Sequence, residues 1–183
     1  MRIIAGKHRS RKLTTLPGDN TRPTLNRVKE AVFSKITNYL CDGIFLDLFS
    51  GSGNIALEAI SRGMNKAILV DKNKASINII KANINSLKED SACVVWNTDY
   101  ITALDRCKQE NLSFKVIYLD PPFNENYLED ILGLIVDYNL LDNNGIIICE
   151  TNKDRVFKVD TSKIKLLSDK TYGSCKITYF IRS

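Results

Sequence analysis

The chain has 183 residues, of which 44% are hydrophobic and 26% are charged. This length and composition fit a globular protein of one ordinary domain, and they exclude a disordered tail protein or a fibre. Its uncharged apolar stretches, such as Gly43–Leu46, are far shorter than a membrane span, and the first residues lack the apolar core of a signal peptide. We therefore expect a cytoplasmic protein with no membrane segment.

Cysteine and histidine are used sparingly. The five cysteines are widely spaced, odd in number and form no C-x-x-C pair, and His8 is the single histidine. This pattern predicts reduced, buried thiols rather than a disulfide framework or a zinc site. With one histidine, hydrolytic triads and zinc hydrolases become poor candidates, and we expect no metal.

The positive charge, net +5, is concentrated at the beginning of the chain. Residues 1–35 contain nine Lys and Arg against two acids, whereas the rest of the chain contains 17 basic and 19 acidic side chains. A basic segment beside a nearly neutral domain favours contact with nucleic-acid phosphates, although a solvated arm that only aids solubility is the alternative. The candidate contacts are Lys7, Arg9, Arg11, Lys12, Arg22 and Arg27.

The first 40 residues are expected to form a separate unit. Residues 13–23 are rich in turn formers and predict a loop, and Thr24 is placed to cap a helix from about Leu25 to Leu40. We assign residues 1–40 to a basic N-terminal arm and helix, and residues 41–183 to a second domain.

Beyond residue 41, predicted strands and helices alternate. Apolar runs predict strands at 44–48, 66–71, 93–96, 115–119 and 145–150, and helical periodicity predicts helices at about 54–62, 74–87, 100–109 and 127–138. Two further strands, 164–168 and 177–181, have no helix between them and predict an antiparallel hairpin at the sheet edge. The expected fold is α/β: a Rossmann-like, doubly wound, mostly parallel seven-stranded sheet with an antiparallel last strand.

The end of the first predicted strand carries a candidate ligand turn. Asp47 is followed by Gly51 and Gly53, which let the backbone turn sharply and approach a ligand. Ligands of doubly wound sheets bind beyond the carboxyl ends of the strands. Asp71 ends the second strand, 20 residues past Gly51, where an acid can meet ribose hydroxyls. The same features imitate a dinucleotide fingerprint, so a nicotinamide-dependent enzyme is an alternative.

The fourth predicted strand runs directly into Asp120-Pro121-Pro122-Phe123. The two prolines lack N–H donors and stiffen the chain, which leaves carbonyl oxygens free. An acid beside such a carbonyl can accept both hydrogens of an exocyclic amine, and the aromatic ring can stack on a flat base. Hydride transfer needs no such set, so this motif favours chemistry on a nucleobase amine.

Together, these motifs resemble a known family. Asp47-x-Phe49-x-Gly51-x-Gly53, Asp71 and Asp120-Pro121-Pro122-Phe123, in this order, resemble the class I S-adenosylmethionine-dependent methyltransferases that modify exocyclic amines. The resemblance narrows to the RsmD family, over essentially the whole chain, through Arg2–Gly6, Arg22-Pro23-Thr24, Arg27–Phe33, Leu57–Gly63 and Tyr172-Gly173. That family comprises bacterial enzymes that methylate the N2 amine of guanine in 16S ribosomal RNA. Asp71 departs from the glutamate that family members commonly carry.

The resemblance implies a cofactor, a partner and site residues. The implied cofactor is S-adenosylmethionine, and the implied partner is 16S rRNA within a small ribosomal subunit or an assembly intermediate, bound by a monomer. The implied cofactor contacts are Asp47, Phe49, Ser50, Gly51, Gly53, Asp71, Asp99 and Tyr100; the implied catalytic residues are Asp120, Pro121, Pro122 and Phe123. Two alternatives stay open: a DNA or other amino-methyltransferase with the same motif, and a nucleotide- or RNA-binding protein without methyl transfer.

Overall fold

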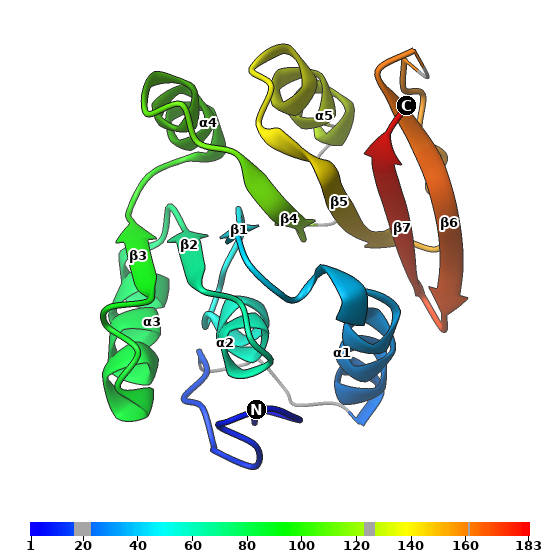
Figure 1. The fold of residues 1–183 in the computed structure, drawn as a ribbon. Coiled ribbons are helices and arrows are strands. Elements are labelled where there is room, and N and C mark those ends of the chain that lie inside the picture. Colours follow the sequence, from blue (N-terminus) through cyan, green and yellow to red (C-terminus); the bar gives the residue numbers. More distant parts are fainter. Residues whose placement is uncertain (17–22, 123–126, 161) are drawn as a thin grey trace.

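The fold is an α/β sheet with helices on both faces, seen here in a computed structural model that describes residues 1–16, 23–122, 127–160 and 162–183 (Figure 1). The strands are β1 (Ile44–Asp47), β2 (Lys66–Val70), β3 (Cys93–Trp96), β4 (Phe114–Leu119), β5 (Leu141–Asn152), β6 (Ile164–Tyr172) and β7 (Cys175–Arg182). The helices are α1 (Pro23–Lys35), α2 (Asn54–Ser61), α3 (Lys74–Leu87), α4 (Tyr100–Gln109) and α5 (Leu128–Asp137), with a short 3₁₀ helix η1 (Thr37–Tyr39). None of these helices is long and apolar enough to cross a membrane.

The strands lie in the order β3-β2-β1-β4-β5-β7-β6, which confirms the predicted doubly wound sheet. The first five strands are parallel, and β7 runs antiparallel to both of its neighbours, β5 and β6. The strand order reverses between β1 and β4, since the chain moves outward to β3 and then returns. Such a switch point is where doubly wound sheets bind their ligands, and it brings the ends of β1 and β4 together.

The sheet separates two hydrophobic cores. Helices α1, α2 and α3 cover one face, and α4 and α5 cover the other (Figure 1). Alternation along each strand sends neighbouring side chains to opposite cores: Phe45 packs with α1–α3, whereas Leu46 packs with α4 and α5. We call the side of the sheet that α1, α2 and α3 cover the α1–α3 face.

Three predicted boundaries were wrong. The helix expected to reach Leu40 ends at Lys35, because the Thr37 hydroxyl donates to the Phe33 carbonyl oxygen (3.0 Å) and the chain continues as η1. The fifth strand begins at Leu141 rather than at residue 145, because a bulge in its pairing with β4 absorbs the turn-forming residues 142–144. The final hairpin is longer than predicted and turns tightly at Gly173, whose φ is +62°.

Residues 1–13, at the beginning of the basic segment, form a small hairpin beside α2 (Figure 1). Arg2 pairs with Lys12, and the buried Ile3 and Leu13 join the core that α1 shares with the sheet. Gly6, with φ +83°, lies so close to α2 that an added Cβ would stand 1.8 Å from the Ser61 carbonyl oxygen. The hairpin is therefore packed on α2 rather than extended into solvent.

Candidate functional site

The glycine turn between β1 and α2 forms one wall of the site. Gly51 and Gly53 both have positive φ, +54° and +77°, which L side chains rarely adopt. The buried Ser50 secures the turn, because its hydroxyl donates to the Asp47 carbonyl oxygen (2.8 Å) and its N–H donates to the Val70 carbonyl oxygen (2.9 Å). The turn is thus a rigid backbone cradle at the N-terminus of α2.

Asp47 is a buried acid beneath this turn. It is 2% exposed, and its carboxyl group accepts a hydrogen bond, at 3.3 Å, from the N–H of Ala56. Burial, assisted by the neighbouring negative charge of Asp71 and only partly offset by hydrogen bonds with Ala56, Phe49 and Ser50, raises the pKa of Asp47 to about 7. Among the described residues, Asp47 takes part in no ion pair. A cationic ligand group would supply the missing partner.

Asp71 connects the end of β2 to the same turn. One carboxylate oxygen accepts the Gly51 N–H (2.9 Å), and the other accepts the Asn73 N–H (2.8 Å). Asn97 braces the loop by donating to the Asp71 carbonyl oxygen (3.0 Å). The structure therefore brings Asp47, the glycine turn and Asp71 together, as their positions after neighbouring parallel strands predict.

Asp120 stands at the end of β4, across the switch point from Asp47. Asp120 and Pro122 are exposed residues, whereas Pro121 is buried. Protein atoms nevertheless crowd around the Asp120 carboxyl group, and this desolvation, followed by the negative charges of Glu150 and Asp47, raises the pKa of Asp120 well above its ordinary value. Phe123 lies outside the described residues.

Three aromatic rings cluster beside the glycine turn. Tyr100 stacks on Tyr127 with ring centroids 4.8 Å apart, and Phe49 lies 6.1 Å from each of them. Phe49 and Tyr100 were predicted, whereas Tyr127 was missed as a site residue. The available signal was its position as an aromatic residue between the Asp120–Phe123 motif and α5.

Asp99 caps α4 through both of its carboxylate oxygens. One accepts the Thr102 N–H (3.0 Å) and the other accepts the Thr102 hydroxyl (2.9 Å). The backbone bond to Thr102 is the main reason that the pKa of Asp99 is lowered. Its side chain is exposed, and a role in cofactor binding stays a prediction.

The predicted RNA contacts divide into two groups. Lys7 pairs with Glu89 (2.7 Å), which also contacts the His8 ring, and the Arg11 guanidinium donates to the Ser86 carbonyl oxygen (2.7 Å). These two cations help to hold the hairpin on the protein. The remaining three described cations are exposed: Arg9, Lys12 and Arg27. Arg22 lies outside the described residues.

Glu58 and Lys29 form a buried ion pair that the sequence analysis missed. The two side chains are 0% and 2% exposed, with 2.9 Å between Lys29 Nζ and Glu58 Oε2. Glu58 also accepts the N–H groups of Ile4 (2.8 Å) and Ala5 (3.0 Å), which fastens the hairpin to α2. Lys29 in turn donates to Asn54 Oδ1 (2.8 Å) at the start of α2. Burial opposes the ionisation of Glu58, yet Lys29 and the N–H donors outweigh it and lower its pKa.

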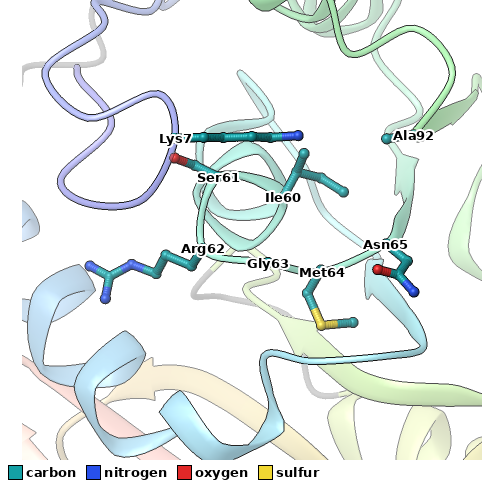
Figure 2. A pocket seen from close by; sticks show the side chains of 8 residues that line it. All are labelled: Lys7, Ile60, Ser61, Arg62, Gly63, Met64, Asn65 and Ala92. Carbon is teal, nitrogen blue, oxygen red and sulfur yellow. The ribbon is translucent and has the colours of Figure 1, made fainter.

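A hollow of about 570 Å³ lies near the amino-terminal ends of the strands, opposite the carboxyl ends that form the candidate site (Figure 2). Its lining comes from the C-terminal end of α2, the loop before β2 and the hairpin, including Ser61, Met64 and Lys7. The acids described above stand at the other ends of the strands. This hollow is therefore separate from the candidate cofactor site.

The donor set suits an organic cation better than a metal ion. In residues 1–16, 23–122, 127–160 and 162–183, no group of three or more His, Cys, Asp or Glu side chains could hold a metal. The site instead combines a glycine cradle, a buried acid without a cationic partner and an acid bonded to the glycine turn. S-adenosylmethionine fits this set, because it carries an ammonium and a sulfonium charge together with ribose hydroxyls.

Solved structures share the whole fold. A putative methyltransferase from Escherichia coli aligns with a TM-score of 0.87 at 29% identity, covering 100% of this chain and 98% of that one. A putative methylase from Haemophilus influenzae aligns with a TM-score of 0.80 at 35% identity, covering 98% and 96%. The chain therefore has the Rossmann-like fold of class I methyltransferases.

Sequence comparison then identifies the family. The family profile described as "Conserved hypothetical protein 95" matches residues 1–181. The "Putative rRNA methyltransferase YlbH" of Bacillus subtilis is 35% identical over 173 residues, 94% of either chain, and "Ribosomal RNA small subunit methyltransferase D" of H. influenzae is 37% identical over 177 residues, 94% of this chain and 89% of its own. The chain belongs to this family, the RsmD family, which confirms the resemblance.

The buried charge of Asp47 makes stability depend on pH. Because its pKa rises from 3.8 to about 7 on folding, the neutral acid is favoured, and this contribution is lost as the pH rises through that window. We expect the free energy of unfolding to fall by up to about 4 kcal/mol between pH 4 and 8 through this group. In Asp47→Asn, the free energy of unfolding should fall much less between these two pH values, as measured by urea denaturation. The exposed Asp90→Asn should behave as wild type; a parallel decline in Asp47→Asn would contradict the assignment.

The buried Glu58 ion pair should dominate the attachment of the hairpin. Glu58→Ala leaves Lys29 without its carboxylate and two hairpin N–H groups without an acceptor, so we expect a loss of about 3–5 kcal/mol in the free energy of unfolding. Glu110→Ala removes an exposed helical pair with Arg106 and should cost less than about 1 kcal/mol. Chemical denaturation measures both changes, and equal losses would show that burial does not govern the pair.

Proposed function

We propose that the protein transfers a methyl group from S-adenosylmethionine to the exocyclic N2 amine of a guanine in 16S ribosomal RNA. The observation that carries the proposal is the position of Asp120 and Pro121 at the switch point, beside the acid-lined glycine turn. The names of the H. influenzae and B. subtilis relatives support rRNA as the substrate. The guanine N2 position rests on the family resemblance.

The cofactor would lie across the ends of β1 and β2. S-adenosylmethionine supplies an activated methyl group when bound. Asp47 would offset the positive charge of its methionine part, and Asp71 would accept its ribose hydroxyls from the position in which Gly51 holds the carboxylate. Phe49 and Tyr100 would border the adenine, together with Tyr127, which stacks on Tyr100. Asp99, at the N-terminus of α4, would stand at the rim of this pocket.

Asp120 and the Pro121 carbonyl would hold the target amine. An exocyclic amine is a poor nucleophile, because its lone pair is delocalised into the ring. Two acceptors that take its two hydrogens turn the lone pair towards the methyl donor, and such positioning contributes about 7 kcal/mol or more in favourable cases. Pro122 stiffens this turn, and Phe123 would stack on the guanine, which must leave its own stack to enter the site.

The hairpin cations would contact the RNA backbone. The eight residues of α2 separate the hairpin from the glycine turn by about 12 Å. Arg9, Lys12 and Arg27, with Arg22, would therefore meet phosphates that flank the target base. Lys7 and Arg11 would support the hairpin, which carries Arg9 and Lys12, whereas Arg27 lies on α1. Residues 1–40 would act as an RNA-binding extension of the methyltransferase domain 41–183, as a monomer in the cytoplasm and on a small ribosomal subunit or assembly intermediate.

Asp120→Ala should abolish methyl transfer while binding of S-adenosylmethionine persists. The variant removes an acceptor of the target amine and leaves the turn from Asp47 to Gly53 intact. Transfer from labelled S-adenosylmethionine to small subunits that lack the modification measures the first effect, and calorimetry measures the second. Mapping the labelled nucleotide also tests the guanine.

The control is Asp169→Ala on the distant β6, which removes the same charge and should keep wild-type transfer. Loss of both transfer and cofactor binding in Asp120→Ala would contradict the role of Asp120. Wild-type protein that binds no S-adenosylmethionine would favour an RNA-binding protein without methyl transfer, and label in DNA but not in rRNA would favour the DNA alternative.

Replacing Arg9, Lys12 and Arg27 with alanine should weaken RNA binding and flatten its salt dependence. Each phosphate contact contributes about 0.7–0.9 to the slope of log K against log salt, so three lost contacts should lower the slope by about 2 to 3. Binding titrations between 50 and 200 mM salt measure this slope. Over that range, a slope lower by 2 to 3 changes the salt dependence of the affinity by about tenfold or more. A matched variant uses Lys72, Lys74 and Lys81 on α3 and the loop before it, and an equal change there would assign the effect to net charge alone.

A further inference from the structure

Glu150 and Asp120 are neighbours at the same level of the sheet. β4 and β5 pair in parallel with Leu119 opposite Cys149, so the next residues on each strand, Asp120 and Glu150, are also level. Tyr118 and Ile148, two residues earlier, both belong to the core of the α1–α3 face. Because side chains alternate and adjacent strands lie about 4.8 Å apart, the two carboxyl groups stand side by side on that face.

Two neutral donors hold the Glu150 carboxylate. The Tyr118 hydroxyl donates to Glu150 Oε2 (2.7 Å), and the Cys175 thiol donates to Oε1 (3.2 Å). Burial, and then the charge of Glu150, raises the pKa of Tyr118 well above its ordinary value, and burial likewise raises that of the Cys175 thiol. Both groups therefore remain protonated donors, which orient the negative charge of Glu150 without cancelling it.

No cation among the described residues balances this arrangement. The titratable groups that interact with Asp120 come from β4 itself, from its two neighbours and from β7: these are Tyr118, Asp47 on β1, Glu150 on β5 and Cys175. All are acidic or neutral, and no ion pair of the described residues includes Asp120 or Glu150. A carboxylate beside fixed negative charge is a stronger base than an isolated one.

We propose that Glu150 is a positioning residue that makes Asp120 the acceptor of the proton which the target amine releases on methylation. The inference rests on the proposed function. The amine nitrogen uses its lone pair to form the new bond to the methyl carbon, while the electron pair of the broken carbon–sulfur bond stays on sulfur. The nitrogen is then cationic and still carries both hydrogens. One of these passes to the Asp120 carboxylate, which leaves a neutral methylamine, and Asp120 later returns the proton to water.

The test compares Glu150→Gln with wild type in two ways. Single-turnover methyl transfer is followed against pH at saturating S-adenosylmethionine, and the titration of the Asp120 carboxyl is followed by ¹³C NMR in cofactor-free protein labelled at aspartate, with Asp120→Asn to identify the signal. Removing the neighbouring charge should shift two midpoints to lower pH by about one unit each: the midpoint of the acidic limb of the rate profile and the midpoint of the NMR titration. A residue that only packed the strand end would lower the rate without moving either midpoint.

Controls separate charge from structure. Asp169→Asn, which removes one exposed acid on β6, and Cys175→Ser, which keeps a donor to Glu150, should leave both midpoints at the wild-type values. Glu150→Ala provides the same loss of charge if thermal melting shows that Glu150→Gln is unfolded. Unchanged midpoints in the folded Glu150 variants would overturn the inference. A shifted NMR midpoint with no RNA methylation by wild type would instead contradict the proposed function and support the effect of Glu150 on Asp120.

Discussion

An acid buried without a cationic partner is the constraint on which the site depends. Asp47 must lie under the glycine turn, because it ends the central strand β1 and its side chain points to the α1–α3 face. There it loses hydration, which its hydrogen bonds offset only in part, so ionisation of Asp47 carries a cost in folding free energy. A ligand with a positive charge at this place would offset that cost, so binding of the cofactor would also stabilise the fold.

Glu58 is also a buried carboxylate, but unlike Asp47 it has cationic partners. It is fully enclosed, yet Lys29, Arg62 and two backbone N–H groups of the hairpin satisfy it. The pair thereby joins the hairpin, α1 and α2 into one unit, and Asn54 extends the contact to the first residue after the glycine turn. The sequence suggests that the basic N-terminal segment is a free arm. In the structure, its hairpin is instead fixed on α2, at a defined distance from the glycine turn.

The two ends of α2 thus carry opposite electrostatics. At its N-terminus, the carboxylates of Asp47, Asp71 and Asp120 suit a cationic methyl donor, whereas the hairpin near its C-terminus presents cations that suit RNA phosphates. Glu150 adds a further negative charge to the acidic end, behind the residue proposed to hold the amine. This separation would allow an anionic substrate to bind the same small protein without being repelled from the whole surface.

Local sequence patterns were enough to predict the alternating strands and helices, the reversed final hairpin, and the meeting of Asp47, Gly51 and Asp71. Parallel strands present their carboxyl ends at one edge, so positions directly after strands identify neighbours without further information. The tertiary structure alone decided that Lys29 pairs with Glu58, that Tyr127 stacks on Tyr100, and that Glu150 stands beside Asp120. These partners lie on elements whose relative placement depends on strand order and register, which single-chain periodicity does not encode.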